Sequence, residues 1–564
     1  MASTVMFNPP AADGGAQAQR MPSIGPRHVV WSLLLFAGMA VLHTWPLAAA
    51  PATWSRHDNG DAMLNEWIVA WIAHQLPRHP LHLFDANIFY PEPNTLAFSE
   101  HMFVPSLMGA PLLWAGLSTL VVHNLLVIGG LALTGWTMCL VMFRWTGDWW
   151  AAVVAGLLLA FNAHSLTRLA NLQAMHVEFL PLALYALDRL FVRPTVAAAF
   201  GLAVAIACQA LSSNYLLVMM AFAMTAAAAS RPMDWLGRDR RRTLVLAIGA
   251  MLGASTMLIP FLLPYLHAMQ DQGLTRSLRA VAVYDASWRD YLTTGGRLHF
   301  RLWSGAIATP AQTALFPGVI RSALALVAIV TGVAWRNRAA RLWITVGIVG
   351  LLLSFGTHLP GYVLLYRAVP LLQGIRATVR FGYLALAAVA GLAGFGLAHL
   401  DRRLPSSKLR TLVGLAAATL VTVEAARLPF GYTHGYEAPA VYHTLALERP
   451  HAVIELPLPP PPAFGRNAPY MLNSMVGWWP VVNGYSGFLP ESYLDRRVDL
   501  AQFPDDESIA VLRRLGVTHV VVHREEFSHR WPDALERLDA PRAMRPVAAD
   551  GDIAIYRLAN EDRQ

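Results

Sequence analysis

The sequence predicts an α-helical protein that crosses a membrane many times and carries a small α/β domain at its C-terminal end. Of its 564 residues, 55% are hydrophobic and only 14% are charged, and the mean hydropathy is +0.41. A soluble protein carries about a quarter charged residues. Long apolar runs recur along most of the chain, whereas the part after Pro429 is less apolar and richer in proline. We therefore expect a multi-span membrane domain followed by a domain outside the bilayer.

The apolar runs of spanning length predict about eleven transmembrane helices. They lie near residues 28–47, 120–142, 149–163, 177–193, 195–211, 215–229, 243–264, 314–334, 341–356, 378–400 and 410–427. The shorter run 103–117 is expected to be an interfacial or re-entrant helix. The predicted parts of the chain are a cytoplasmic tail (1–27), the membrane domain (28–427) and the C-terminal domain (428–564).

Basic residues predict the orientation of these helices. With the N-terminus inside, the densest basic loops all fall on the cytoplasmic side, as expected for membrane proteins; they are "RWTGD" (144–148), "RPMDWLGRDRRR" (231–242), "RNRAAR" (336–341) and "DRRLPSSKLR" (401–410). The opposite, outer side then holds the first outer loop (48–102), the second outer loop (162–178), the loop 265–313, the loop 357–380 and the C-terminal domain.

Several classes of function are disfavoured. The net charge of +8 comes from these basic loops, which are typical signals of membrane orientation, so the charge does not indicate nucleic-acid binding. Cys139 and Cys208 lie in apolar runs and predict neither a disulfide nor a cysteine zinc site. The sequence has no Walker A loop, G-x-G-x-x-G, H-E-x-x-H or G-x-S-x-G motif.

The C-terminal domain is predicted to be α/β. Strand-like runs occur at 451–458, 517–523 and 551–558, and apolar positions at helical spacing occur at 505–516.

The first outer loop contains "WSRHDNGDAMLNEWIVAWIAHQL" (54–76), in which Asp58 and Asp61 precede a helical run. Trp67 and Trp71 share one face of that run, which predicts a helix lying in the membrane interface. Either carboxylate there could act as a general base on a membrane-anchored substrate. The alternative is that Asp58 or Asn59 caps the helix and Asp61 stabilises its dipole.

The second outer loop ends in "MHVE", with His176 and Glu178 at the start of a span. An ionisable residue at that depth indicates a functional site. The alternative is that Glu178 pairs with Arg168 or a neighbouring histidine for packing.

A third candidate is "GIRATVR", which places Arg376 and Arg380 on one face of a helix entering the membrane from outside. A guanidinium matches phosphate oxygens and keeps its charge, so these residues predict a lipid-phosphate site, with Arg367 as a weaker member. Headgroup snorkelling or a salt bridge to the C-terminal domain is the alternative.

The loop 265–313 contains "YDASWRDYL", whose Asp285, Arg289, Asp290 and Tyr291 could order over a substrate or form a plain interfacial helix. The loop "NGYSGFLPESY" (483–493), which is rich in glycine and aromatic residues, is expected to be a structural turn. The alternative is that its aromatic rings stack on sugars.

A divalent metal such as Mg²⁺ or Mn²⁺ is a further possibility. His101 and His164 could ligate one together with Asp58 and Glu178, although no characteristic spacing supports it.

The acidic "NGD" in a long first outer loop, followed by predicted interfacial helices, resembles the GT-C superfamily of polytopic glycosyltransferases, which use polyprenyl-phosphate sugars. That resemblance implies that Asp61 is the catalytic base, with His176 and Glu178 at the acidic or histidine positions of the second outer loop. The chain is also similar to the bacterial YfhO-like branch, which implies a location in the bacterial inner membrane. The similar stretches are loose and cover most of the chain; they include "FDANIFYPEPNTLAFSEH" (84–101), "NLQAMHVEFLPLAL" (171–184), "LLQGIRATVRFGYLALAAVAGLAGFGL" (371–397) and "VNGYSGFLPESY" (482–493).

Three functions follow as hypotheses. The first is transfer of a sugar from a polyprenyl phosphate to an outer glycan, lipid or protein. The second is transport of a lipid carrier or polysaccharide, which predicts charged residues at the bilayer midplane that these spans nearly lack. The third is a scaffold for cell-envelope glycan assembly, which leaves the "DNGD" stretch unexplained.

Overall fold

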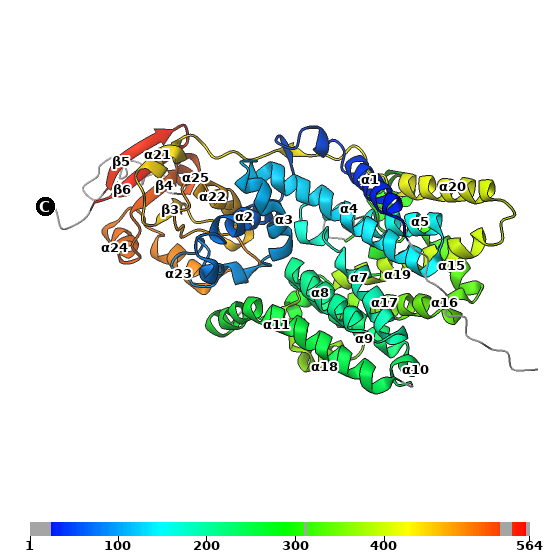
Figure 1. Ribbon diagram of the computed structural model, residues 1–564. Coiled ribbons are helices and arrows are strands. Elements are labelled where there is room, and N and C mark those ends of the chain that lie inside the picture. The colour runs from blue at the N-terminus through cyan, green and yellow to red at the C-terminus, as the bar shows by residue number, and fades with distance from the viewer. Residues whose placement is uncertain (1–23, 238, 274, 309–312, 531–543, 560–564) are drawn as a thin grey trace, which may run out of the picture.

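The computed structural model describes residues 24–237, 239–273, 275–308, 313–530 and 544–559. It has a large helical part and a smaller sheet-containing part, which lies at one end of the molecule (Figure 1). Every predicted apolar segment coincides with a helix. These helices are α1 (Pro26–His43), α4 (Thr119–Thr146), α5 (Trp149–Ala160), α7 (Phe179–Val192), α8 (Val196–Ser212), α9 (Asn214–Ala229), α11 (Arg240–Gln272), α15 (Val319–Val330), α17 (Arg338–Ser354), α19 (Gly382–Asp401) and α20 (Ser407–Ala425).

Among the described residues, four helical stretches are by themselves long and apolar enough to cross a membrane. They are Thr119–Thr146, Trp149–Thr167, Arg240–Gln272 and Thr378–Asp401. The multi-span class is thus supported, whereas the predicted count of eleven spans stays a prediction, because several of the other helices are short.

Helix α19 is the centre of the helical part. It packs against α5, α15 and α17, and 89% of its most apolar stretch is buried inside the protein. Its glycines allow this close packing: a Cβ atom on Gly391 would lie 2.6 Å from the Trp343 ring, and one on Gly394 would lie 2.7 Å from Met142 Cε. By contrast, only 17% of the most apolar stretch of α11 is buried inside the protein, so most of the apolar surface of α11 is exposed to its surroundings.

Short helices fill the predicted outer loops. They are α2 (Gly60–Gln75), α3 (Phe103–Trp114), α6 (Ala163–Thr167), α12 (Leu278–Ala282), α13 (Arg297–His299), α14 (Gly305–Ile307) and α18 (Tyr362–Ala368). The predicted helices at 54–76 and 103–117 are thereby confirmed as helices. The tryptophan face of α2 is not open to its surroundings: Trp67 and Trp71 are only 1% and 5% exposed, because α2 is covered by α3, α4 and the C-terminal helix α22 (Ala468–Ser474). The interfacial position of α2 stays a prediction.

The C-terminal domain is built on a four-stranded sheet of order β3-β4-β6-β5. Strands β3 (Val453–Leu456) and β4 (His519–His523) are parallel, whereas β6 (Ile553–Leu558) is antiparallel to β4 and to β5 (Met544–Asp550). In the register, Val453 pairs with His519 and Val520 with Tyr556. Helices α21 (Val441–Leu447), α23 (Glu491–Asp499), α24 (Asp506–Arg514) and α25 (Arg524–Arg530) accompany the sheet. The predicted strands and the predicted helix at 505–516 are confirmed.

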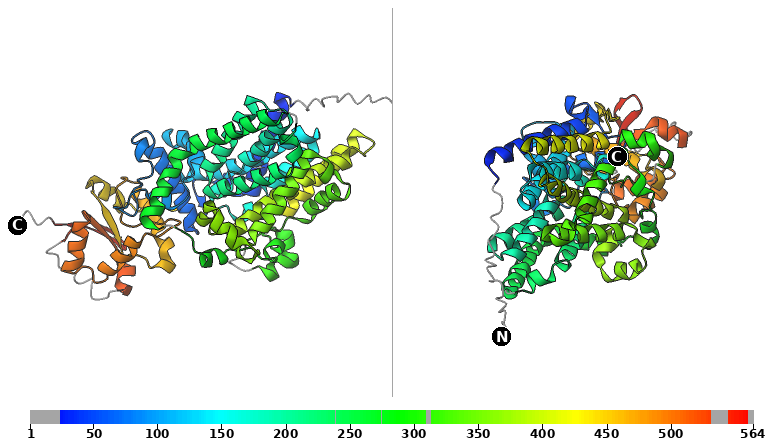
Figure 2. Two further views of the ribbon diagram at one scale, coloured as in Figure 1. Left: turned by 90° about the horizontal axis from the view of Figure 1, so that it is seen from below. Right: turned by 90° about the vertical axis from the view of Figure 1, so that its right-hand side faces the viewer.

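The first outer loop is joined to the C-terminal domain. Strand β1 (Trp54–Ser55) pairs with β2 (Thr433–His434), and the Asn87 amide donates to the Trp479 carbonyl at 2.9 Å. Figure 1 shows α2 and α3 next to the C-terminal domain, and in the view from below the blue helices that follow α1 again adjoin the yellow and orange C-terminal part (Figure 2). This contact brings distant parts of the chain to one site.

Candidate active site at the start of helix α2

Asp61 lies in the first turn of α2. The side chain of Asn59 caps this helix, because its Oδ1 atom accepts a hydrogen bond from the Asp61 backbone N–H at 2.9 Å. The capping alternative is therefore correct for Asn59. The cap leaves the Asp61 carboxylate free for other partners, at a helix end whose dipole favours a negative charge.

Two side chains from distant segments hold the Asp61 carboxylate. Asn171 of the second outer loop donates from Nδ2 to Oδ2 at 3.0 Å, and Tyr485 of the C-terminal domain donates its hydroxyl to Oδ1 at 2.8 Å. Burial and the neighbouring Asp61 charge raise the pKa of the Tyr485 phenol, so the phenol stays protonated and acts as the donor. Residues of two distant segments therefore fix the orientation of the Asp61 carboxylate.

Asp58 has a different role. Its two oxygens receive Arg56 Nε at 2.9 Å and Nη2 at 3.1 Å, and the pair is exposed. These hydrogen bonds from Arg56 hold the pKa of Asp58 below its ordinary value. The structure thus gives Asp58 a surface ion pair, and its carboxylate does not share the partners of Asp61.

His176 and Glu178 pair with each other inside the helical part. His176 Nδ1 lies 3.0 Å from Glu178 Oε1, its Nε2 lies 3.1 Å from the Leu126 carbonyl, and both side chains are buried. This is the packing alternative with a neighbouring histidine. Glu178 Oε2 has no hydrogen-bond partner among the described residues.

Three arginines of the chain each lie on an aromatic ring. The guanidinium carbon of Arg380 is 4.1 Å from the ring centre of Tyr215, that of Arg376 is 4.7 Å from Tyr284, and that of Arg276 is 3.4 Å from Phe488. Within the described part of the chain, none of these arginines has a carboxylate within 4 Å. Such unpaired cations suit an anionic ligand.

Tyr215 organises this arginine cluster (Arg276, Arg376 and Arg380). Its hydroxyl accepts hydrogen bonds from the backbone N–H groups of Arg376 and Ala377, each at 3.2 Å. Its own backbone N–H donates to Glu100 at 3.1 Å. Arg367, by contrast, is exposed on α18 and is not held in this way.

Arg168 links the arginine cluster to Asp61. Burial and the charge of Arg380 lower the pKa of Arg168 to about 10, and the Asp61 carboxylate acts in the opposite direction. Arg380 also lines a cavity with His164, Gln173, Ser213, Tyr215 and Tyr383. The carboxylate and the unpaired cations therefore share one electrostatic environment.

In the loop 265–313, for which the sequence predicts contact with the substrate, two aspartates accept hydrogen bonds from other residues of the protein. Asp285 accepts hydrogen bonds from the Thr357 N–H at 2.8 Å and the Thr378 hydroxyl at 2.5 Å. Asp290 accepts from the N–H and the hydroxyl of Ser287 at 2.8 and 2.7 Å. Asp285 therefore ties this loop to the loop 357–380, whereas Asp290 fixes a turn of its own loop.

The same prediction includes Tyr291 and Arg289, which differ in their surroundings. The hydroxyl of Tyr291 lies 2.8 Å from that of Ser354, and burial raises the pKa of Tyr291 to about 12. Arg289 is exposed.

The residues predicted for a metal do not fit one. His101 bonds the Tyr265 hydroxyl at 3.0 Å and stacks on Phe261, and burial lowers its pKa to about 3. His164 packs against Tyr383. Among the described residues, no three histidine, cysteine, aspartate or glutamate side chains gather as metal ligands.

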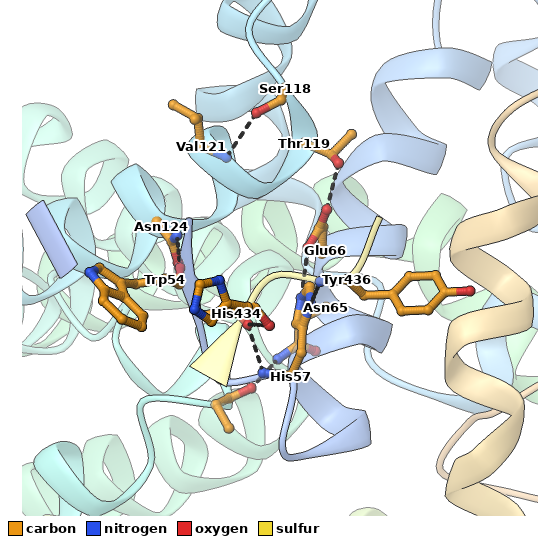
Figure 3. Close-up of polar contacts among 12 residues, drawn as sticks. Trp54, His57, Asn65, Glu66, Ser118, Thr119, Val121, Asn124, His434 and Tyr436 are labelled. Atoms are coloured by element: carbon orange, nitrogen blue, oxygen red, sulfur yellow. Dashed lines mark hydrogen bonds and ion pairs between the residues drawn. The ribbon is translucent and has the colours of Figure 1, made fainter. Parts of the chain in front are cut away.

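A buried polar chain connects α2 to the C-terminal domain (Figure 3). The backbone N–H of Tyr436 donates to His57 Nδ1 at 2.9 Å, so the ring proton is on Nε2, which faces Glu66 at 2.9 Å. The Thr119 hydroxyl donates to the other oxygen of Glu66 at 2.5 Å. This chain fixes α2, and with it Asp61, against both parts of the molecule.

Sequence reasoning missed Tyr485, Asn171 and Tyr215 as partners in this site. Each lies in a stretch that the sequence singles out, but a local pattern does not show that these stretches meet.

The fold and this site define a polytopic membrane protein with a fixed carboxylate beside unpaired arginines. No family model matches the chain, and no curated protein sequence matches it. Among solved structures, the apo oligosaccharyltransferase of Archaeoglobus fulgidus aligns over 88% of this chain and 70% of its own, with a TM-score of 0.50 and 15% identity.

Two further structures are similar over most of the chain. The A. fulgidus oligosaccharyltransferase AglB with an inhibitory peptide and a dolichol-phosphate aligns over 95% of this chain and 74% of its own (TM-score 0.49, 14% identity). ArnT from Cupriavidus metallidurans bound to undecaprenyl phosphate aligns over 94% and 97% (TM-score 0.40, 14% identity). The chain therefore shares the overall fold of the apo A. fulgidus oligosaccharyltransferase, and its membership of the GT-C superfamily stays a prediction. The YfhO-like branch stays a prediction.

Proposed function

We propose that this protein is a membrane glycosyltransferase that moves a sugar from a polyprenyl phosphate to an acceptor hydroxyl on the outer side of the membrane. The observation that carries the proposal is the Asp61 carboxylate, which Asn171 and Tyr485 hold at 3.0 and 2.8 Å in the electrostatic environment of Arg168 and the arginine cluster. The fold shared with an oligosaccharyltransferase supports it.

In this proposal, each group has one task. Asp61 takes the proton of the acceptor hydroxyl as that oxygen attacks the anomeric carbon of the donor sugar. The bond between the anomeric carbon and the phosphate oxygen breaks, and the polyprenyl phosphate leaves with the electron pair. Arg376 and Arg380 stabilise the charge of the leaving phosphate. A single displacement of this kind inverts the anomeric configuration.

The remaining predicted residues have supporting tasks. Glu178 and His176 form a buried pair that would brace the second outer loop, which carries Asn171. Asp285 and Asp290 fix the loop that carries Tyr284, the ring beneath Arg376. The sugar and the acceptor are not assigned by this site.

The test replaces Asp61 with asparagine in cells that otherwise lack the protein. At matched protein levels, Asp61→Asn is expected to accumulate the lipid-linked donor and to lose an outer glycan, as the strain without the protein does. Loss of a general base costs about 10²- to 10⁴-fold in rate.

Asp58→Asn is the matched control, because it removes the same charge three residues away. It is expected to behave like the wild type. Wild-type behaviour of Asp61→Asn would refute the assignment of the base. An unchanged glycan and donor pool in the strain without the protein would favour the scaffold hypothesis.

A further inference from the structure

Tyr215 gives the arginine cluster more than the ring beneath Arg380. It lies in the first turn of α9, and its side chain is only half-buried, so a ligand can reach it. Glu100 of the first outer loop fixes this turn, because one carboxylate oxygen accepts the Tyr215 N–H at 3.1 Å and the Ser213 hydroxyl at 2.5 Å. The phenol of Tyr215 therefore has a defined place in the cluster.

The Tyr215 hydroxyl accepts two hydrogen bonds and keeps its own proton free. The backbone N–H groups of Arg376 and Ala377 each donate to it at 3.2 Å. A phenol oxygen also carries one proton, which it can donate. Within the part of the chain that the structure describes, no group accepts this proton. The two N–H groups thus hold the hydroxyl in place while its donor stays available.

The surroundings of this donor are cationic. The Arg380 guanidinium lies over the Tyr215 ring, and the Arg376 guanidinium lies over the Tyr284 ring. Burial and the charge of Arg376 lower the pKa of Arg276 to about 10, so the arginines of the cluster repel one another. A bound anion relieves this repulsion, and it accepts hydrogen bonds from any O–H or N–H group beside it.

We propose that the Tyr215 hydroxyl donates a hydrogen bond to the phosphate group of the lipid carrier and is a further binding residue of the donor site. The inference rests on the proposed function, which supplies the phosphate. The hydrogen bond becomes stronger as the bond between sugar and phosphate breaks, because the leaving phosphate gains negative charge. Tyr215 then stabilises the leaving group together with Arg376 and Arg380.

The test measures binding, so it does not depend on turnover. The probe is undecaprenyl phosphate, added to the purified full-length protein in detergent. Undecaprenol has the same tail without the phosphate, so the ratio of the two affinities gives the preference for phosphate. Wild type is expected to show this preference, and Tyr215→Phe is expected to reduce it by about 10- to 100-fold, as for one lost hydrogen bond to a charged group. Tyr432→Phe, the matched control, removes a phenol hydroxyl that donates to the Thr44 carbonyl at 3.0 Å and is expected to keep the full preference.

A second variant separates the donor role of the hydroxyl from its acceptor role. Tyr215→Phe also removes the acceptor of two N–H groups, so a shift of the loop 357–380 would weaken binding as well. When both phenols are protonated, 3,5-difluorotyrosine is a stronger donor and a weaker acceptor than tyrosine, because fluorine withdraws electrons. We therefore expect the protein with 3,5-difluorotyrosine at position 215 to bind undecaprenyl phosphate several-fold more tightly. Unchanged or weaker binding would show that the hydroxyl serves only as an acceptor and would overturn the inference.

Two other outcomes distinguish this inference from the proposed function. If wild type prefers undecaprenyl phosphate and Tyr215→Phe keeps the full preference, the inference fails while the phosphate site stands. If wild type binds undecaprenol equally well, the proposed phosphate site fails, and the role of Tyr215 fails with it.

Discussion

Replacing Tyr485 with phenylalanine tests whether the C-terminal domain positions the base. The substitution removes the hydroxyl that donates to Asp61 Oδ1 at 2.8 Å. It keeps the ring, whose centre lies 5.5 Å from that of Phe464 and whose edge approaches Gly60. The packing between the two parts of the molecule is therefore preserved, and only one hydrogen bond is lost.

The size of the effect follows from that bond. A hydrogen bond to a charged group contributes about 1.5–3 kcal/mol, and every 1.4 kcal/mol in a barrier is a factor of ten in rate. We therefore expect kcat to fall by about 10- to 100-fold. KM for the donor is expected to change much less, because the donor phosphate is bound by the arginines in the proposed mechanism.

The assay measures consumption of the lipid-linked donor that accumulates in cells without the protein. Tyr493→Phe is the matched control: this buried tyrosine of the same domain bonds Asn467 and the Pro459 carbonyl, at 2.9 and 3.0 Å. Its variant is expected to lose stability but to keep its turnover. Wild-type turnover by Tyr485→Phe, or equal slowing by both variants, would refute the positioning role.

Two further predictions concern stability. Glu66→Gln removes one partner of the buried pair with His57 and is expected to lower the free energy of unfolding in detergent by about 3 kcal/mol. Glu437→Gln changes an exposed neighbour of Tyr436 and is expected to change that free energy by no more than about 0.5 kcal/mol. Equal unfolding midpoints for the two variants would contradict the pairing. Burial alone lowers the pKa of His523, but its hydrogen bond to Glu455 at 2.7 Å and the charge of that group outweigh burial and raise the pKa. The stabilisation from the charged His523 is complete below about pH 6.5 and is lost as the pH rises through the pKa of His523 in the folded protein. The difference in unfolding midpoint between wild type and His523→Gln should therefore shrink between pH 6 and 9. A difference that stays constant over this range would contradict the prediction.

The sequence by itself determines the helices and several site residues. Apolar runs of spanning length give the positions of α4, α11 and α19, because the pattern of hydrophobic residues is a local property of the chain. The same local reasoning puts Asp61 at the start of a helix and Arg376 close to Arg380.

Only the tertiary structure decides which of these residues meet. Tyr485 reaches Asp61 across 424 positions of the chain, and no local pattern records that contact. The tryptophan face of α2 suggests an interface, yet the C-terminal domain covers it, because the burial of a face depends on what packs against it. Asp285 and Asp290 look like substrate ligands in the sequence, but nearby hydroxyl and N–H groups take up both carboxylates.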